Sequence, residues 1–312
     1  MWILLAFVSA ALLGFYDVAK KQALRDNAVP VVLLLNTLFS TILFSPFIIS
    51  AECGAGWFDG TIFEVAQGSW HDHMLVVIKS AIVLSSWIFG YIGIKHLPIT
   101  IVGPINATRP VLVLLGALLI FGERLNGLQW VGVTLAIVSV FLLSRAGRKE
   151  GIDFKNNIWI LSIAAAAVFG AVSGLYDRYI MRELEPVFVQ SWYNLYQFLM
   201  MSAAVVVVRV VQGRGVAFHW SWAIPMISIL LSAADLAYLI ALSDKEAMIS
   251  VVSMVRRSSV VVSFVCGAML FKESNLRAKA WDLVLILVGM IFLYLGTKWV
   301  KYILLLHFFA NK

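Results

Sequence analysis

Two adjacent arginines stand in the middle of an otherwise apolar stretch. Arg256 and Arg257 interrupt residues 247–271, a segment long enough for a helix that crosses a membrane. If this helix begins near residue 247, Arg256 lies ~14 Å along it at 1.5 Å per residue, close to the middle of the bilayer. A charge at that depth costs at least ~2.5–3.5 kcal/mol, so it normally faces a polar cavity or an opposite charge. The segment therefore indicates either a structural ion pair or a binding site for an anion.

A third arginine lies at a similar depth in another apolar stretch. Arg109 is ~16 Å from the start of the predicted span 98–121, and Asn106 shares its helical face three residues earlier. Pro104 and Pro110 should interrupt the backbone hydrogen bonds of this helix. Transporters place binding groups at such interruptions. The alternative is that the prolines only bend the helix for packing.

Arginine is suited to binding an anion because its planar guanidinium donates two parallel hydrogen bonds and keeps its charge. Neighbouring residues on a helix point about 100° apart, so the two adjacent arginines cannot point the same way. We expect Arg257, on the face of Ser253, to contact the anion directly. Arg256 would instead pair with Asp235, which is deep in the predicted span 221–243. The alternative role for Asp235 is to carry a proton that couples transport to the proton gradient.

The predicted span 187–208 carries an unusual density of polar and aromatic side chains. This group begins about five residues into the span and continues to mid-depth, beyond an interfacial aromatic belt. Lining of a solute cavity and ordinary packing are both open readings. Residues four apart share a helical face, which places Trp192 with Tyr196, and Tyr193 with Gln197. The candidate solute contacts of this span are Trp192, Tyr193, Asn194 and Tyr196, with Asn36, Ser40 and Thr41 as partners from the span 30–51.

Three further charges lie nearer the predicted ends of spans. Lys79 is about five residues into the span 74–94, so we expect it to extend to the membrane surface and have no role. Asp17 and Asp177 end their spans beside Lys20 and Arg178. We expect these pairs to cap helices or close a gate rather than to contact solute.

The composition predicts an all-α polytopic membrane protein. Of 312 residues, 62% are hydrophobic and only 13% are charged, against ~25% in an ordinary soluble domain. The net charge of +7 comes without a Lys/Arg-rich motif, so we expect no nucleic-acid partner. His71 and His73 are too few for a metal site, and we expect no metal and no cofactor. Ten transmembrane helices are predicted, at 2–20, 30–51, 74–94, 98–121, 127–144, 158–180, 187–208, 221–243, 247–271 and 281–299.

Two short strings recur along the chain. Gly-Phe-Tyr-Asp at 14–17 returns as Gly-Leu-Tyr-Asp at 174–177, and Phe-Gly-Glu at 121–123 returns as Phe-Lys-Glu at 271–273. The offset is ten residues smaller for the second pair, which matches the shorter polar loop in the second half. Two halves of five spans follow, and because five is odd they must be inverted relative to each other. The predicted units are a first repeat at 1–146, a connecting loop at 147–157, a second repeat at 158–300 and a C-terminal tail at 301–312.

This plan resembles the EamA-type drug/metabolite transporter superfamily, with Pro110 thirteen residues before Glu123 and Gly-Leu-Gln-Trp-Val-Gly at 127–132. Within that superfamily, Val-Arg-Arg-Ser-Ser-Val-Val-Val-Ser at 255–263 resembles the ninth span of triose-phosphate and nucleotide-sugar translocators. The resemblance implies that Arg256 replaces a lysine, and Arg257 matches an arginine, that contact the substrate phosphate.

One departure from those translocators limits the comparison. The fourth-span lysine of those proteins corresponds here to Ile105 or Asn106, and the basic residue is Arg109 instead. The resemblance therefore supports an anion site rather than a particular phosphate ester.

The sequence thus predicts a secondary transporter, not an enzyme, that moves a small anionic metabolite, phosphorylated or carboxylate, by alternating access. Because unpaired arginines are unfavourable to enclose, we expect exchange to be favoured over net flux. The rival readings are an exporter of amino acids or other amphipathic metabolites, a membrane enzyme acting on lipid phosphates, and a scaffold. We expect a monomer or homodimer in the bilayer of the bacterial plasma (inner) membrane. The charges of the loops place the termini outside, whereas the family implies cytoplasmic termini.

Overall fold

The computed structural model describes residues 2–109, 111–113, 115, 126–148, 152, 154–181, 183–212, 218–243, 255–271 and 276–310. Within these ranges the regular structure is entirely helical, as predicted, and contains no strand. The helices are α1 (Trp2–Ala23), α2 (Val29–Glu52), α3 (Trp70–His96), α4 (Ile99–Ala107), α6 (Gly127–Arg148), α7 (Ile158–Ile180), α8 (Pro186–Gln212), α9 (Ala223–Ser243), α11 (Ser259–Phe271) and α12 (Leu276–Ala310).

The long helices have the length and surface of membrane-spanning segments. Within the described ranges, five stretches are long and apolar enough to cross a bilayer: Trp2–Ala23, Val29–Glu52, Trp70–His96, Ile158–Asp177 and Leu276–Gly296. Large apolar side chains such as Leu4, Val206 and Met269 are more than half exposed on the outside of the bundle. A bilayer would cover such a surface, and the helices satisfy their own backbone hydrogen bonds.

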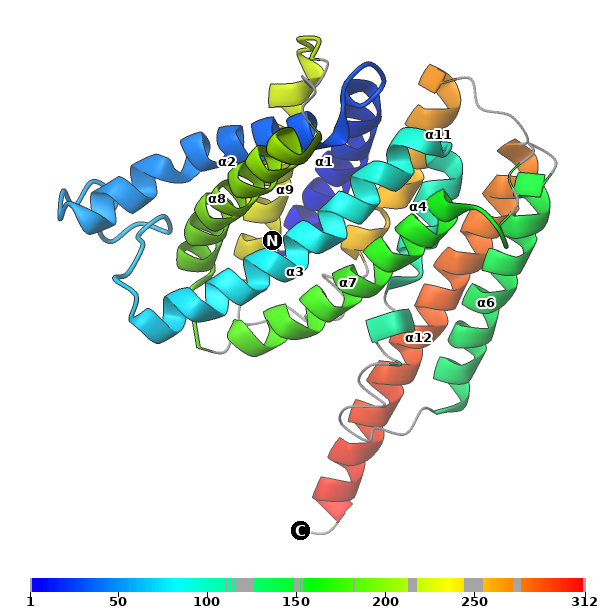
Figure 1. Cartoon of the computed structure of the whole chain (residues 1–312). Coiled ribbons are helices and arrows are strands. Elements are labelled where there is room, and N and C mark those ends of the chain that lie inside the picture. The colour runs from blue at the N-terminus through cyan, green and yellow to red at the C-terminus, as the bar shows by residue number, and fades with distance from the viewer. Residues whose placement is uncertain are drawn as a thin grey trace.

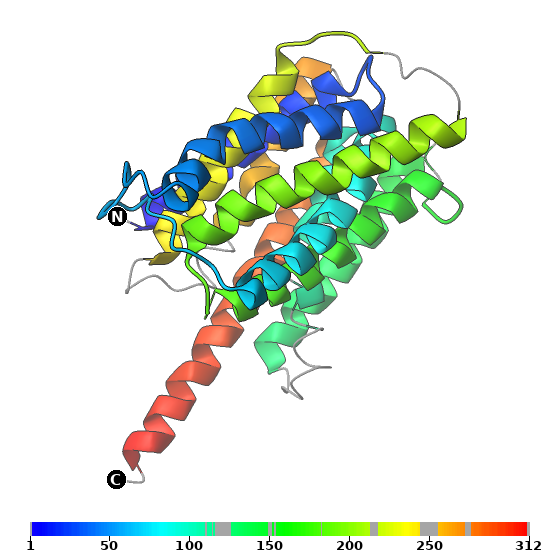
Figure 2. The same ribbon diagram turned by 60° about the vertical axis from the view of Figure 1, so that its left-hand side comes forward.

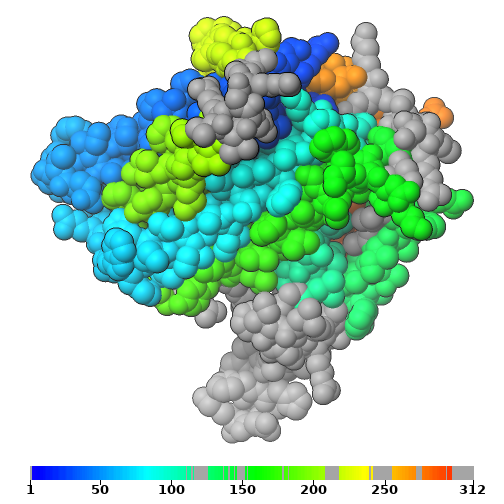
Figure 3. Space-filling view, viewed as in Figure 1, coloured from blue at the N-terminus to red at the C-terminus, as the bar shows by residue number. Residues whose placement is uncertain are grey.

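Eight of the described helices form a closed ring in which each contacts the next. The order around the ring is α2, α8, α3, α7, α4, α11, α1 and α9, with α9 returning to α2. Figure 1 and Figure 2 show α2 and α8 side by side on one flank of the molecule. Figure 3 shows α3 between α8 and α7 on one face. The helices α6 and α12 pack on each other outside the ring, and both also contact α4.

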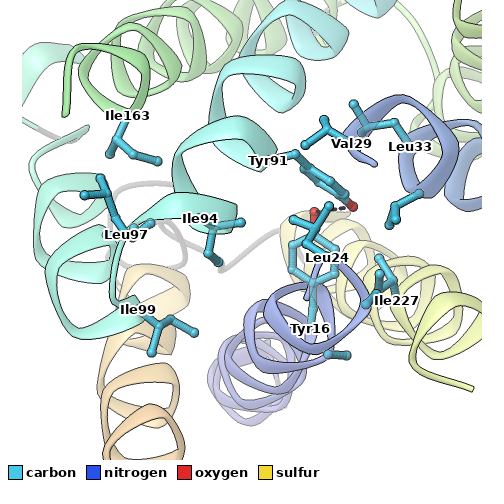
Figure 4. Packing of buried hydrophobic residues seen from close by; sticks show 14 of the residues in the cluster. Tyr16, Leu24, Val29, Leu33, Tyr91, Ile94, Leu97, Ile99, Ile163 and Ile227 are labelled. Atoms are coloured by element: carbon cyan, nitrogen blue, oxygen red, sulfur yellow. Dashed lines mark hydrogen bonds between the residues drawn. The ribbon is translucent and has the colours of Figure 1, made fainter. Parts of the chain in front are cut away.

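Closely packed apolar side chains fill part of the ring interior. Tyr16 of α1 and Tyr91 of α3 point toward each other within a cluster of buried aliphatic side chains, and their hydroxyl oxygens are 3.3 Å apart (Figure 4). At Gly93 of α3, a Cβ atom would overlap the side chain of Ile163 on α7. A small residue is therefore required there for the two helices to approach, as is common between helices in membranes.

The predicted spans 98–121 and 247–271 are both interrupted. The helix α4 ends at Ala107, and the Thr108 hydroxyl donates to the carbonyl oxygen of Ile105 at 2.7 Å. Ser258 repeats this arrangement with the carbonyl of Val255 at 2.6 Å, immediately before α11. At both turns the backbone N–H also bonds to the carbonyl three residues earlier, as in a 3₁₀ turn.

The interruption near Arg109 was predicted from the prolines, but the prediction of a continuous helix through Ser258 is wrong. The serine hydroxyl takes part in a tighter turn that its sequence context does not require. Residues 244–254 lie outside the described part of the chain.

Candidate solute-binding site

Arg256 has both an acidic and an aromatic partner. Its guanidinium forms an ion pair with the Asp235 carboxylate of α9, and these side chains are only 18% and 15% exposed. The hydroxyl of Tyr193 on α8 donates to the other Asp235 oxygen at 3.2 Å. The ring of Tyr238 lies 4.2 Å from the guanidinium carbon, a cation–π arrangement. Since these partners compensate its charge, Arg256 has the geometry of the structural pair that was one of the two predicted readings.

Arg109 and Arg257 differ from Arg256, because neither forms an ion pair with any acid in the described ranges. Arg109 donates to the Asn106 side-chain oxygen at 3.1 Å, and its buried Nε has no partner there. Its guanidinium packs so closely on Gly170 of α7 that a Cβ at that position would lie 2.6 Å from the guanidinium carbon. The positive charges of Arg109 and Arg256 both act on Arg257, while the Asp17 carboxylate, which also pairs with Lys20, attracts Arg109 and Arg257. The interior of the ring therefore gathers positive charge that its described acids do not neutralise.

Two further ion pairs flank this region. Asp17 of α1 binds Lys20 at 2.6 Å and accepts a hydrogen bond from Ser263 of α11 at 3.3 Å. Asp177 of α7 binds Lys79 of α3, whose side chain is only 12% exposed. The prediction that Lys79 extends to the membrane surface is therefore wrong, because a carboxylate on the facing helix compensates its charge inside the bundle.

These pairs give a simple charge balance. Among the side chains just described, three carboxylates each neutralise one cation: Asp17 with Lys20, Asp177 with Lys79, and Asp235 with Arg256. Arg109 and Arg257 are left, with a combined charge of about two. In a low-dielectric interior such charges repel each other strongly and favour a bound anion.

The aromatic residues of α8 divide between two places. Tyr193 reaches the Asp235–Arg256 pair, and Lys79 lies 5.5 Å from the centre of its ring. Trp192 and Tyr196 stack on each other with 5.8 Å between ring centres, at the start of α3. There the Tyr196 hydroxyl is 2.8 Å from Nδ1 of His73. Tyr193 lies apart from Trp192 because adjacent residues of a helix point about 100° apart.

Asn194 belongs to a third group, which we call the polar seam. It consists of Asn36 and Ser40 of α2 with Ser191, Asn194 and Gln197 of α8, each at most 2% exposed. Side-chain atoms of all five have no hydrogen-bond partner among the described residues. The remaining predicted contact, Ser253, lies outside those residues. No cluster of three or more potential metal ligands occurs in the described ranges.

Comparison with known proteins agrees with this architecture. The model of the EamA-like transporter family matches residues 1–145. For this first half of the chain, the match confirms the predicted resemblance to EamA-type transporters, and the apolar helices are those of an integral membrane protein.

Two individual relatives add detail to the family match. An uncharacterized transporter of Archaeoglobus fulgidus is 25% identical to this chain over 150 residues, which cover 47% of this chain and 49% of the relative. The match thus spans about half the length of that relative. A protein of known crystal structure has a TM-score of 0.64 at 18% identity, covering 96% of this chain and 98% of its own. At that identity the likeness concerns the fold alone.

Proposed function

We propose that the protein is a ten-span secondary transporter of a small anionic metabolite, phosphorylated or carboxylate. The observation that carries this proposal is the pair Arg109 and Arg257, part-buried inside the helix ring without an acidic partner among the described residues. An arginine fork binds phosphate or carboxylate through two parallel hydrogen bonds, and it keeps its charge in a buried site. A bound anion would therefore supply the negative charge and hydrogen-bond acceptors that the described residues do not give to Arg109 and Arg257.

Two inverted halves of five helices are part of this proposal, and the helix contacts support them. The contact of α1 with α9 is matched by that of α7 with α3, and α1 with α11 by α7 with α4. The contact of α2 with α9 is matched likewise by α8 with α3. The turns at Thr108 and Ser258 occupy equivalent places in the predicted spans 98–121 and 247–271. Alternating access in inverted-repeat transporters takes place around a site between such halves.

The charge balance favours a solute with two negative charges. A phosphate monoester or a dicarboxylate would neutralise both Arg109 and Arg257, whereas a zwitterionic amino acid would bring its own cation close to them. Enclosing the empty site would leave two unpaired charges in a low-dielectric interior, so exchange is favoured over net flux. The proposed location is the bacterial plasma (inner) membrane, and the proposed oligomeric state is a monomer or homodimer.

Ligand-dependent thermal stability of the detergent-purified protein tests the anion site. A ligand at 100 times its dissociation constant stabilises the folded state by ~2.7 kcal/mol if it does not bind the unfolded chain. We expect stabilisation by phosphorylated or dicarboxylate compounds, and its loss in Arg257→Gln. Arg25→Gln, the same change at an exposed position, is the matched control. Stabilisation only by neutral or cationic compounds would show that the arginines are structural.

Transport assays in proteoliposomes test the mode of transport. We expect uptake of labelled solute to accelerate when the same solute is present inside. Equal uptake with and without internal solute would contradict exchange while leaving the anion site intact.

A further inference from the structure

The polar seam contains more unsatisfied hydrogen-bonding capacity than any other described group. The unpartnered atoms are Nδ2 of Asn36, Oγ of Ser40, Oγ of Ser191, Nδ2 of Asn194 and both side-chain polar atoms of Gln197. Buried polar groups of folded proteins nearly always have a partner, and a buried orphan is markedly unfavourable. Several orphans on two facing helices therefore indicate that something polar occupies this place during function.

Simple attachment of α2 to α8 does not account for the seam. Polar residues that hold membrane helices together do so by bonding to one another across the interface. Here the described link between the two faces is the Thr41 hydroxyl, which donates to the backbone carbonyl of Asn194 at 3.1 Å. Asn36 accepts a hydrogen bond through Oδ1 from Ser228 of α9 at 3.0 Å, and its amide nitrogen is left over. The seam residues thus keep donors and acceptors free.

The seam lies beside the arginines on two helices. Along α9, Asp235 follows Ser228 by about two turns on the same face, ~10 Å at 1.5 Å per residue. Along α8, Asn194 directly follows Tyr193, whose hydroxyl binds Asp235. Because Arg257 directly follows Arg256, which pairs with Asp235, a small solute held by Arg257 could extend toward the seam.

We propose that the polar seam binds the uncharged, hydroxyl-bearing part of the solute whose anionic end is held by Arg109 and Arg257. This inference rests on the proposed function. The free amide nitrogens donate, the Gln197 oxygen accepts, and the serine hydroxyls do both, which matches hydroxyl groups that also donate and accept. A hydrocarbon chain would leave all of these groups unpaired. A second charged group would find no opposite charge within the seam.

Binding of matched phosphates to the full-length purified protein tests the proposal. Glycerol 3-phosphate and n-propyl phosphate carry the same charged group on a three-carbon chain and differ in hydroxyl groups. By isothermal titration calorimetry we expect the wild-type protein to bind glycerol 3-phosphate at least about tenfold more tightly, as sites built for hydroxyls reject analogues that lack them. Asn36→Leu and Gln197→Met should reduce this ratio to about one and preserve the affinity for n-propyl phosphate.

A matched control is available at the next residue of α2. Thr37 is also buried, but its hydroxyl bonds to the carbonyls of Leu33 and Leu34 within its own helix. Thr37→Val should therefore leave the ratio unchanged. If the larger changes prevent folding, Ser191→Ala removes a single hydroxyl from the seam and should lower the ratio by a smaller factor.

Each outcome separates this inference from the proposed function. Equal affinities of the wild-type protein for the two phosphates, or a ratio unchanged in Asn36→Leu and Gln197→Met, would overturn the role of the seam and leave the anion site standing. Binding of glycerol without binding of either phosphate would overturn the anion site and support the seam alone.

Discussion

Asp235→Asn should destabilise the protein because it leaves Arg256 buried without its counter-charge. The replacement keeps the shape of the side chain but removes the negative charge of the carboxylate that pairs with Arg256 and accepts a hydrogen bond from Tyr193. Removing one partner of a buried ion pair costs about 3–5 kcal/mol. We expect the lower end, about 3 kcal/mol, because both side chains remain slightly exposed.

Equilibrium unfolding in mixed micelles with increasing sodium dodecyl sulfate measures this loss. Arg256→Gln should produce a similar loss, since it leaves the Asp235 carboxylate unpaired. The double variant has no unpaired charge at this place, so it should recover most of the stability and fall about 1 kcal/mol below the wild type. Tyr193→Phe is the control for the hydrogen bond alone and should cost about 1 kcal/mol.

The reasoning would be refuted by additive losses. If the double variant were destabilised by the sum of the two single changes, the Asp235 and Arg256 side chains would not be energetically coupled. A change below about 0.5 kcal/mol in Asp235→Asn would be typical of a solvated surface site and would contradict the buried ion pair.

Two further predictions concern the contact between α3 and α7. Gly93→Ala should lower the unfolding free energy by about 1–3 kcal/mol, because the new Cβ overlaps the side chain of Ile163. Adding Ile163→Ala should restore part of this loss, and a double variant no more stable than Gly93→Ala would contradict this account. Lys79→Met should cost about 1–2 kcal/mol by leaving Asp177 unpaired and part-buried, whereas Lys79→Met with Asp177→Asn should recover it. Denaturant unfolding measures both, and an unaltered midpoint in Lys79→Met would place its ammonium group in solvent.

The sequence by itself determined the positions of most helices and the depth of their charges. The predicted span 158–180 coincides with α7. The resemblance to EamA-type transporters was predicted from short motifs, and a model of that family matches residues 1–145. The interruption before Arg109 was also predictable, because proline removes a backbone donor and clashes with the preceding turn. Hydropathy, helical rise and backbone restrictions are local properties, so the order of residues is sufficient to predict them.

The tertiary structure alone decided that Lys79 pairs with Asp177, whereas the pairing of Arg256 with Asp235 was predicted from the sequence. Lys79 and Asp177 are far apart in the chain, and only the packing of α3 on α7 brings them together. The same holds for the polar seam: the sequence made Asn194 a candidate solute contact and placed Gln197 on the face of Tyr193, but whether they find hydrogen-bond partners depends on α2 opposite them. No proline near Ser258 predicts the break in the helix there. Serine is compatible with both a continuous helix and a turn, so the sequence did not distinguish them. A residue's depth follows from its own helix, whereas its partners follow from the packing of helices distant in sequence.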